Sequence, residues 1–405
     1  MSGHPVRALD EGELRAAHDL FVGTLHHTTV DDTQWERRRA SYTPGRTFGV
    51  FDAAGRLVGT SMSYPSQTAV PGGAVLPLGA VTRVGVRADH TRRGVATALM
   101  RAQLDDLRAR GDALALLWAT ESGIYGRYGY GVATRARSVR VRASRTALRP
   151  SAPSGGTVRV LDRHEIVPVL TAVHDTLALR RPGGITRTPG WWGVGLARHD
   201  DDPLLVAVHS GQEGDDGFAL AVPHGVFGDP LGGTLRVEDL HAADTAAAAG
   251  LWRFLLGVDL IGYVEASVAL DDPLDLLLDD PRHALVTGLA DETWLRLVDV
   301  PAALAARSFA AGAGPVVLAV HDPLLPDNTG MYRIAAEGAE RVGPLGACDP
   351  ELSCDVAALA MAYLGDRSPS ALAGTGWWEV HDPSALPRAD ALFATGVAPW
   401  CGTHF

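Results

Sequence analysis

The early part of the chain contains a predicted strand, a basic turn and a helix start in direct succession. The strand ends at residues 84–86, the turn contains Arg92, Arg93 and Gly94, and helical spacing of apolar residues begins at Val95. A helix start presents unpaired backbone N–H groups and a positive dipole end, and arginine binds oxyanions through paired hydrogen bonds. Because glycine also lets a ligand approach the backbone, the segment indicates a pyrophosphate site. An ordinary solvated loop is the alternative.

A second group of polar and aromatic residues follows the next predicted strand. Apolar residues 113–118 predict that strand, Thr120 and Glu121 end it, and three tyrosines alternate with glycines at 125–130. A phenol with a pKa near ~10 is protonated at neutral pH and can act as a general acid. The turn therefore offers either a proton donor or a set of packing aromatic side chains.

The elements that must position these residues belong to more than one domain. The chain has 405 residues, and domains of about 150 residues predict two to three of them. Residues 145–156 are rich in Pro and Gly and indicate a linker, residues 158–288 repeat the α/β pattern without a second basic glycine turn, and a third pattern begins at Trp294. The hydrophobic patterning predicts helices at 11–25, 95–110, 163–179, 300–307 and 355–364, and strands at 48–51, 57–63, 76–86, 113–118, 203–209, 218–223, 315–320 and 330–335.

The composition is that of an acidic globular protein. Hydrophobic residues make up 46% and charged residues 20% of the chain, and 36 basic against 47 acidic residues give a net charge of −11. An acidic surface repels phosphate backbones and anionic lipids. We therefore expect no nucleic-acid or membrane partner, and we expect cationic small molecules to be favoured.

The cysteines and the apolar segments predict a cytoplasmic protein. Cys348, Cys354 and Cys401 form no CxxC pair, which indicates a reducing compartment and no structural metal site. The first residues lack the apolar segment of a signal peptide, and charges interrupt the longest apolar stretch, 251–270.

The order of strand, basic turn, helix and tyrosine turn resembles the coenzyme A site of the GNAT superfamily of N-acetyltransferases. Longer motifs are similar to the Eis (enhanced intracellular survival) family of that superfamily. They are LWATESGIYGRYGYG at 117–131, RRPG at 180–183 ahead of Trp191 and Trp192, WLRLVDVPAALAAR at 294–307 and APWCGTHF at 398–405. The resemblance therefore extends over all three segments.

This resemblance implies an α/β (α+β) fold in which two tandem GNAT-like mixed-sheet domains precede a sterol-carrier-protein-like α+β domain. Residues 1–145 would form the catalytic GNAT domain and residues 157–290 a central GNAT-like domain without a cofactor site. Residues 291–405 would form the third domain and supply the C-terminal carboxylate.

The resemblance also implies two catalytic groups. Tyr125 would protonate the departing coenzyme A thiolate, and the terminal carboxylate of Phe405 would accept the proton of the amine. A carboxylate held close to an alkylammonium can do this directly or through water. The aromatic approach to the terminus favours a docked tail, whereas most chain ends are frayed.

Acetyl-CoA is the implied donor, with no metal. Its pantetheine arm would pair with strand residues 84–86, a strand amide there would polarise the acetyl carbonyl, and its pyrophosphate would bind the turn that follows. The implied contacts are Val84, Gly85, Val86, Arg92, Arg93, Gly94, Val95, Ala96, Thr97, Thr120 and Glu121. Thr91 departs from the superfamily's motif, which begins with Arg or Gln, so one basic contact is missing.

The implied acceptors are primary amines of cationic small molecules, above all aminoglycosides at several positions. Trp35 follows Asp31 and Asp32 and could stack on an aminosugar, although an ordinary packing role is the alternative. Members of the family assemble as hexamers. Protein lysines or polyamines remain alternative acceptors, and a non-catalytic sterol-carrier-like binding protein is the alternative from another class.

Overall fold

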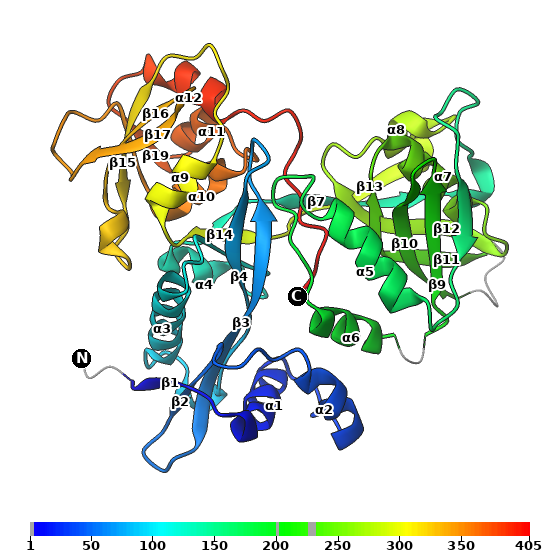
Figure 1. The fold of residues 1–405 in the computed structure, drawn as a ribbon, viewed down its shortest axis with the longest axis horizontal. Helices are drawn as coiled ribbons and strands as arrows, with labels where there is room; N and C mark the ends of the chain where they lie inside the picture. The colour runs from blue at the N-terminus through cyan, green and yellow to red at the C-terminus, as the bar shows by residue number, and fades with distance from the viewer. Residues whose placement is uncertain (1–3, 200–201, 226–231) are drawn as a thin grey trace.

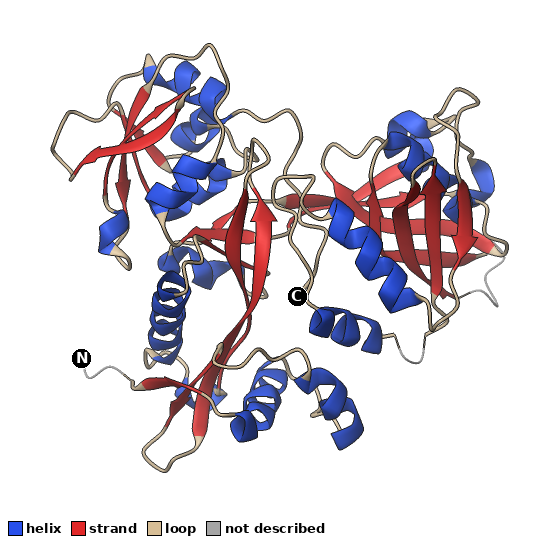
Figure 2. Cartoon of the chain, in the orientation of Figure 1, coloured by secondary structure: helices blue, strands red, loops and turns tan. Residues whose placement is uncertain are grey.

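The computed structural model describes residues 4–199, 202–225 and 232–405. Its strands form three mixed sheets, each accompanied by its own helices (Figures 1 and 2). The predicted class, two related α/β units followed by a smaller α+β unit, is confirmed. Of the helices in these ranges, none is long and apolar enough to cross a membrane.

The first sheet carries the segment with the basic turn. Helices α1 and α3 cover its opposite faces, because a Cβ at Gly85 would meet α1 and one at Gly59 would meet α3. In spatial order its strands are β1 (Val6–Ala8), β2 (Thr47–Phe51), β3 (Leu57–Ala69), β4 (Val75–Val86), β5 (Leu114–Leu117), β14 (Trp294–Leu297) and β6 (Gly131–Val132). Its helices are α1 (Leu14–Thr24), α2 (Asp32–Arg39), α3 (Val95–Ala109) and α4 (Ser122–Tyr125).

The second sheet has the same plan as the first. Four antiparallel strands are followed by a parallel one, β11 beside β12 in the second sheet and β4 beside β5 in the first. Its strands in order are β13 (Ala284–Asp291), β7 (Arg135–Val141), β12 (Ile261–Ala269), β11 (Gly233–Ala242), β10 (Gly214–His224), β9 (Leu205–Gly211) and β8 (Thr157–Val160). Its helices are α5 (Ile166–Leu177), α6 (Pro189–Ala197), α7 (Thr245–Leu256) and α8 (Leu274–Leu277).

The third sheet is smaller and has a different strand order. Its strands are β17 (Gly338–Gly343), β16 (Gly330–Ala335), β15 (Val316–His321), β18 (Leu352–Asp355) and β19 (Trp378–Val380). Its helices are α9 (Val300–Ala306), α10 (Val356–Tyr363), α11 (Pro369–Gly374) and α12 (Ala385–Phe393). The core of this unit continues into the first sheet, since Leu295 and Leu297 of β14 share one buried cluster with Leu318 and Leu359.

The sheets exchange strands across the predicted domain boundaries. β7 lies within residues 1–145 but pairs with β12 and β13 in the second sheet. β14 lies after residue 291 but pairs with β5 and β6 in the first sheet. The division at 1–145, 157–290 and 291–405 stays a prediction about domains. Long-range strand pairing, which no local pattern reports, makes the three units interdependent.

A buried ion pair joins the first sheet to the third unit. Arg296 on β14 donates to Asp322 Oδ2 at 2.6 Å, and the two side chains are 0% and 1% exposed. Asp322 also accepts from Asn328 Nδ2 at 2.8 Å. Removing one partner of such a pair leaves an uncompensated charge in the core.

We expect Arg296→Met to destabilise the protein by about 3–5 kcal/mol, since Asp322 would lose its counter-ion. The measurement is the midpoint of thermal unfolding, with Arg333→Met on the exposed face of β16 as the matched control. Arg333 is 44% exposed and should tolerate the same change. Equal midpoints for the two variants would contradict this role of the ion pair.

Candidate active site

Strands β4 and β5 separate at the point where the predicted coenzyme strand begins. Their parallel pairing runs from Leu78 opposite Leu114 to Val81 opposite Leu117, whereas β4 continues to Val86. On its β5 side, this last part of β4 has no strand partner among the described residues. Backbone groups on an unpaired strand edge can bond an extended ligand as a further strand would.

A bulge shapes the same stretch of β4. Thr82 pairs with Met62 and Gly85 with Thr60, so Arg83 and Val84 together oppose one residue of β3. Arg83 has a φ of 51°, a left-handed conformation that is uncommon without glycine and changes the direction of the side chain. The bulge therefore redirects the backbone at the point where the strands separate.

The lack of a side chain at Gly85 serves the packing of α1. A Cβ there would lie 3.0 Å from Thr24 Oγ1 and 3.3 Å from the Cα of Phe21. This close approach explains the glycine without a ligand, and the predicted cofactor role of Gly85 rests on its backbone. Val86 pairs with Gly59, and Val84 lines the cavity described below.

The basic turn leads into the N-terminus of α3 as predicted. Gly94 is the N-cap residue with a φ of 87°, and Arg92 has a φ of 60°. No described side chain caps the helix, and a Cβ at Gly94 would meet nothing within 4 Å. The space at Gly94 is therefore open, and no described side chain accepts from the first-turn amides of Val95, Ala96 and Thr97, which suits an anion.

The charges around this turn are available to a ligand. Arg92 and Arg93 are exposed, and neither has an ion-pair partner among the described residues. Thr97 Oγ1 lies 3.3 Å from the hydroxyl of Tyr128, which joins the helix start to the tyrosine turn. Thr120 lines the cavity, and Glu121 is exposed at the N-cap position of α4.

Tyr125 ends α4 with its phenol in the protein interior. The residue is 5% exposed, and its ring packs edge-on against Tyr130 with centroids 6.1 Å apart. Burial, then the neighbouring Tyr128 and Glu121, raises the pKa of Tyr125 to about 12. The hydroxyl bonds to no other described residue, so a protonated donor is free for a ligand.

One cavity of about 660 Å³ brings the two predicted catalytic residues together. Tyr125 and Phe405 both line it, with Val84 and Thr120 of the predicted cofactor set. The lining also includes residues of α1, the end of α6 and the chain terminus. The predicted return of the C-terminus to the first unit is therefore present, and Figure 1 shows the tail running down between the first two sheets.

Glu292 holds this tail through its backbone. The carboxylate accepts from the amide of Cys401 at 3.0 Å and of Gly402 at 2.7 Å, and the residue is 3% exposed. Burial raises the pKa of Glu292, and the two amides act in the opposite direction. The carboxylate fixes the turn of the tail just before its last residues.

Arg187 and two indoles secure the final residues. Arg187 donates to the Gly402 carbonyl and to Thr403 Oγ1, each at 3.1 Å, and is itself held by Asp239. The indole N–H of Trp118 donates to the Thr403 carbonyl at 2.9 Å, and that of Trp191 donates to the His404 carbonyl at 2.7 Å. Sequence reasoning did not assign these holding residues, although the paired Trp191 and Trp192 were a visible signal.

Trp35 does not line the cavity. Its ring packs against Tyr42 and His18, with centroids 5.7 and 5.5 Å away, and Arg15 lies over it. This placement favours the packing alternative, and stacking on a substrate stays a prediction for Trp35. His18 and Gln34 are the neighbouring residues that reach the cavity wall.

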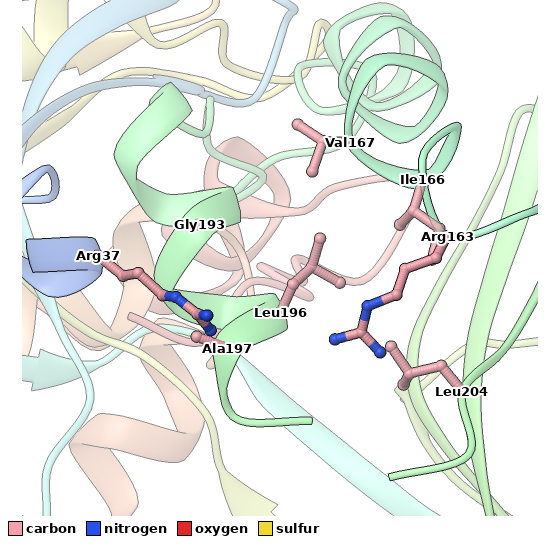
Figure 3. Close-up of a pocket in the computed structure, with 8 residues that line it drawn as sticks. All are labelled: Arg37, Arg163, Ile166, Val167, Gly193, Leu196, Ala197 and Leu204. Carbon is pink, nitrogen blue, oxygen red and sulfur yellow. The ribbon is translucent and has the colours of Figure 1, made fainter. Parts of the chain in front are cut away.

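A smaller hollow lies between α5 and α6 and contains none of the predicted site residues (Figure 3). Its volume is about 380 Å³, and apolar residues such as Ile166 and Leu196 form most of its wall. Arg37 and Arg163 extend into it from two sides. Of the described residues, no group of three or more His, Cys, Asp or Glu could hold a metal ion.

Comparison with known families assigns a class to each unit. A family described as acetyltransferase (GNAT) domain matches residues 5–133, a second acetyltransferase (GNAT) family matches residues 183–297, and the sterol carrier protein domain matches residues 300–402. The fold is that of an N-acetyltransferase of the GNAT superfamily, which implies acetyl-CoA as the donor.

Individual relatives show to which family of this superfamily the chain belongs. An uncharacterised N-acetyltransferase of Streptomyces avermitilis is 36% identical and covers 95% of this chain and 94% of its own. N-acetyltransferase Eis of Mycobacterium bovis is 34% identical over 86% of each chain. The crystal structure of Eis1 from Mycobacterium abscessus, 36% identical, covers 99% of this chain and 100% of its own with a TM-score of 0.90. The chain belongs to the Eis family of N-acetyltransferases.

We expect Glu292→Gln to loosen the tail, because an amide can accept only one of the two backbone bonds and turns a donor toward the other. Loss of one such buried hydrogen bond costs about 1–3 kcal/mol and leaves the terminal carboxylate less well positioned. We therefore expect kcat to fall about tenfold or more, with little change in KM for acetyl-CoA. Release of Phe405 by carboxypeptidase should become faster. The control is Glu340→Gln, because the Glu340 side chain is 69% exposed. Wild-type rates of carboxypeptidase cleavage in Glu292→Gln would refute the anchoring role.

Proposed function

We propose that this protein transfers an acetyl group from acetyl-CoA to a primary amine, with Tyr125 as general acid and the carboxylate of Phe405 as general base. The single observation that carries the proposal is the common cavity of a buried phenol and the chain terminus. The phenol makes no competing hydrogen bond to a described residue. The terminal carboxylate has no ion-pair partner among the described residues, so its charge is available to an ammonium group.

The coenzyme would lie along the free edge of β4. The backbone of residues 84–86 would bond the pantetheine arm, and an amide there would polarise the acetyl carbonyl. The uncapped amides of Val95, Ala96 and Thr97, together with Arg92 and Arg93, would hold the pyrophosphate. The residues present fit this ligand, because the helix start has open space above Gly94.

The second unit supports the assignment of the donor site to the first. Its corresponding helix, α7, has Asp244 as its N-cap residue, and the Asp244 carboxylate accepts from the amides of Ala246 and Ala247 at 2.8 and 2.9 Å. A carboxylate bound there competes with a phosphate. We propose that the central unit works without a coenzyme.

The proposed reaction needs two proton carriers. The Phe405 carboxylate accepts a proton from the ammonium group of the acceptor and passes it to water, which leaves a neutral nitrogen. The neutral nitrogen then attacks the acetyl carbon, so that the N–C bond forms and the C–S bond breaks. During this step a second nitrogen proton passes to the Phe405 carboxylate, and Tyr125 gives a proton to the sulfur. Water restores both groups, and the products are an N-acetyl amide and the thiol.

The raised pKa of Tyr125 sets how this residue can act. A phenol with a pKa of about 12 stays protonated throughout the neutral range. Transfer of its proton to a thiolate of pKa ~8.5 is uphill by itself, so the hydroxyl first donates a hydrogen bond as charge builds on sulfur, and the proton transfer is completed as the C–S bond breaks and water reprotonates the phenolate.

The acceptor predicted from the family resemblance is an aminoglycoside acetylated at several positions, with polyamines and protein lysines as alternatives. The primary amine is common to all three. Cytoplasmic location and the absence of a metal also stay predictions.

We also propose a homo-oligomer, a hexamer as the resemblance implies. Strand β13 forms the edge of the second sheet and exposes Leu285, Val286 and Leu289 by 60%, 50% and 59%. Apolar edge strands of this kind invite a second chain. Light scattering after size exclusion should give six chains, and Leu285→Glu with Leu289→Glu should give smaller species. A monomeric wild-type protein would exclude the proposal.

We expect Tyr125→Phe to lower kcat by about 10²–10⁴-fold, because the proton donor acts as the C–S bond breaks. The affinity for acetyl-CoA should change little, since the ring remains. Thiol release measures kcat and calorimetry measures the affinity, with Tyr263→Phe in the second unit as the control. Unaltered turnover would remove Tyr125 from the mechanism.

Adding one alanine after Phe405 should lower kcat by about 10²-fold or more, because the carboxylate moves by one residue along the chain. Substituting Phe405 by Leu keeps the carboxylate on the same backbone and should retain much more activity. Thiol release measures both variants. Full activity in the extended protein would refute the terminal base.

A further inference from the structure

The lining of the cavity carries positive charge although the chain as a whole is acidic. Arg38 from α2, Arg83 from β4 and Arg198 directly after α6 line it, and no Asp or Glu side chain is among its described lining residues. Among the described lining residues, the terminal carboxylate of Phe405 is the one anionic group. Three guanidinium groups against one carboxylate leave two excess positive charges, in a chain whose net charge is −11.

Arg83 is buried without a carboxylate partner among the residues that the structure describes. It is 8% exposed, donates to Ser41 Oγ at 2.8 Å and contacts Met62 Sδ at 2.9 Å. Its guanidinium lies over the ring of Tyr42, 4.2 Å from the centroid. Neutral partners offset only part of the cost of burying a charge. A bound anion nearby would offset more of that cost.

The other two arginines have free donors. Neither Arg38 nor Arg198 has an ion-pair partner among the described residues, and Arg198 uses one N–H to reach His404 Nδ1 at 3.3 Å. Such a guanidinium can bind an oxyanion through two parallel hydrogen bonds. Because His404 precedes Phe405, this donor lies close to the proposed base.

Two histidines of the wall, His18 and His404, add neutral polar groups. Burial, then the charges of Arg83 and Arg38, lowers the pKa of His18 to about 3. His18 is 2% exposed, and its Nε2 has no hydrogen-bond partner among the described residues. Desolvation, then the charge of Arg198, lowers the pKa of His404 to about 4. His18 and His404 therefore add no positive charge to the wall at neutral pH, whereas Arg38, Arg83 and Arg198 do.

The coenzyme phosphates do not account for this cluster. They are assigned to Arg92, Arg93 and the start of α3, whereas Arg83 packs against Ser41 and Tyr42, which follow α2. The arginines thus surround the acceptor end. Positive charge there lowers the pKa of an ammonium group and favours the neutral nucleophile. A polycation would bring further positive charges to a wall with one carboxylate.

We propose that the acceptor is an amine that also carries an anionic group, a carboxylate in the simplest case, which Arg38 and Arg198 bind while the nitrogen reaches the terminus of Phe405. This inference rests on the proposed acetyltransferase function and narrows its substrate class. It opposes the polycationic acceptors that the family resemblance implies.

The test measures how fast the full-length protein acetylates a set of matched acceptors. Straight-chain amino carboxylates of increasing length are set against their primary amides, 1,4-diaminobutane and the aminoglycoside kanamycin. Thiol release and product mass give kcat/KM for each. At the best length we expect the carboxylate to exceed its amide by about tenfold or more, the range of a charge-assisted hydrogen bond.

Variants identify the residues responsible. In Arg38→Gln and Arg198→Gln, the ratio of kcat/KM for the carboxylate to kcat/KM for its amide should fall toward one. Arg198→Glu should shift the preference toward the diamine. Arg333→Gln, on the third sheet, should keep the wild-type ratio. Faster reaction with kanamycin or the diamine than with every carboxylate, or a ratio unchanged in the variants, would overturn the inference and leave acetyl transfer standing. Failure to acetylate any amine would instead reject the proposed function.

Discussion

The hydrogen bonds from the Cys401 and Gly402 amides to Glu292 are the constraint on which the site depends. They hold the last residues of a three-unit chain against its first unit, where the tail closes the cavity that also contains Tyr125. Arg187 adds bonds from the second unit. All three units thus contribute to one cavity: the first supplies the phenol and the strand proposed for the coenzyme, the second an anchor, and the third the tail.

The first two sheets share one geometric feature, a strand that continues past its parallel pairing, but the free part of that strand has a different role in each. The parallel pairing of β4 with β5 ends at Val81, and that of β11 with β12 ends at Val237, but β4 and β11 continue beyond these residues. The free part of β4 is proposed for the coenzyme. The corresponding part of β11 carries Asp239, which holds Arg187 and through it the tail. The capped start of α7 fits this change, since Asp244 bonds the amides that α3 leaves open. The first sheet is proposed to bind the coenzyme, and the second holds the chain end through Arg187.

Local patterns predicted some elements closely and missed others, including helices α2 and α6 beside the cavity. The helix expected at 95–110 is α3 (Val95–Ala109), and the strand expected at 330–335 is β16 (Gly330–Ala335). Helical periodicity and alternation are local, so one sequence reports them. The placement of β14 in the first sheet and the bonds of Glu292 depend on long-range pairing, which no local pattern encodes. The positions of Arg83 and His404 in the sequence already indicated positive charge near the acceptor entrance. The addition of Arg38 and Arg198 to the same cavity depends on the fold, and a net charge summed over the whole chain does not report it.

The proposed base differs from every side-chain base in how it is inherited. A substitution at the last codon changes the ring of Phe405 but leaves a carboxylate on the same backbone atom. In the proposed mechanism the base is a backbone group, so an extension beyond Phe405 would displace it whereas a change of that side chain would not. Affinity purification should accordingly use the N-terminal end, and fusions at the other end should be made cleavable without leaving residual residues.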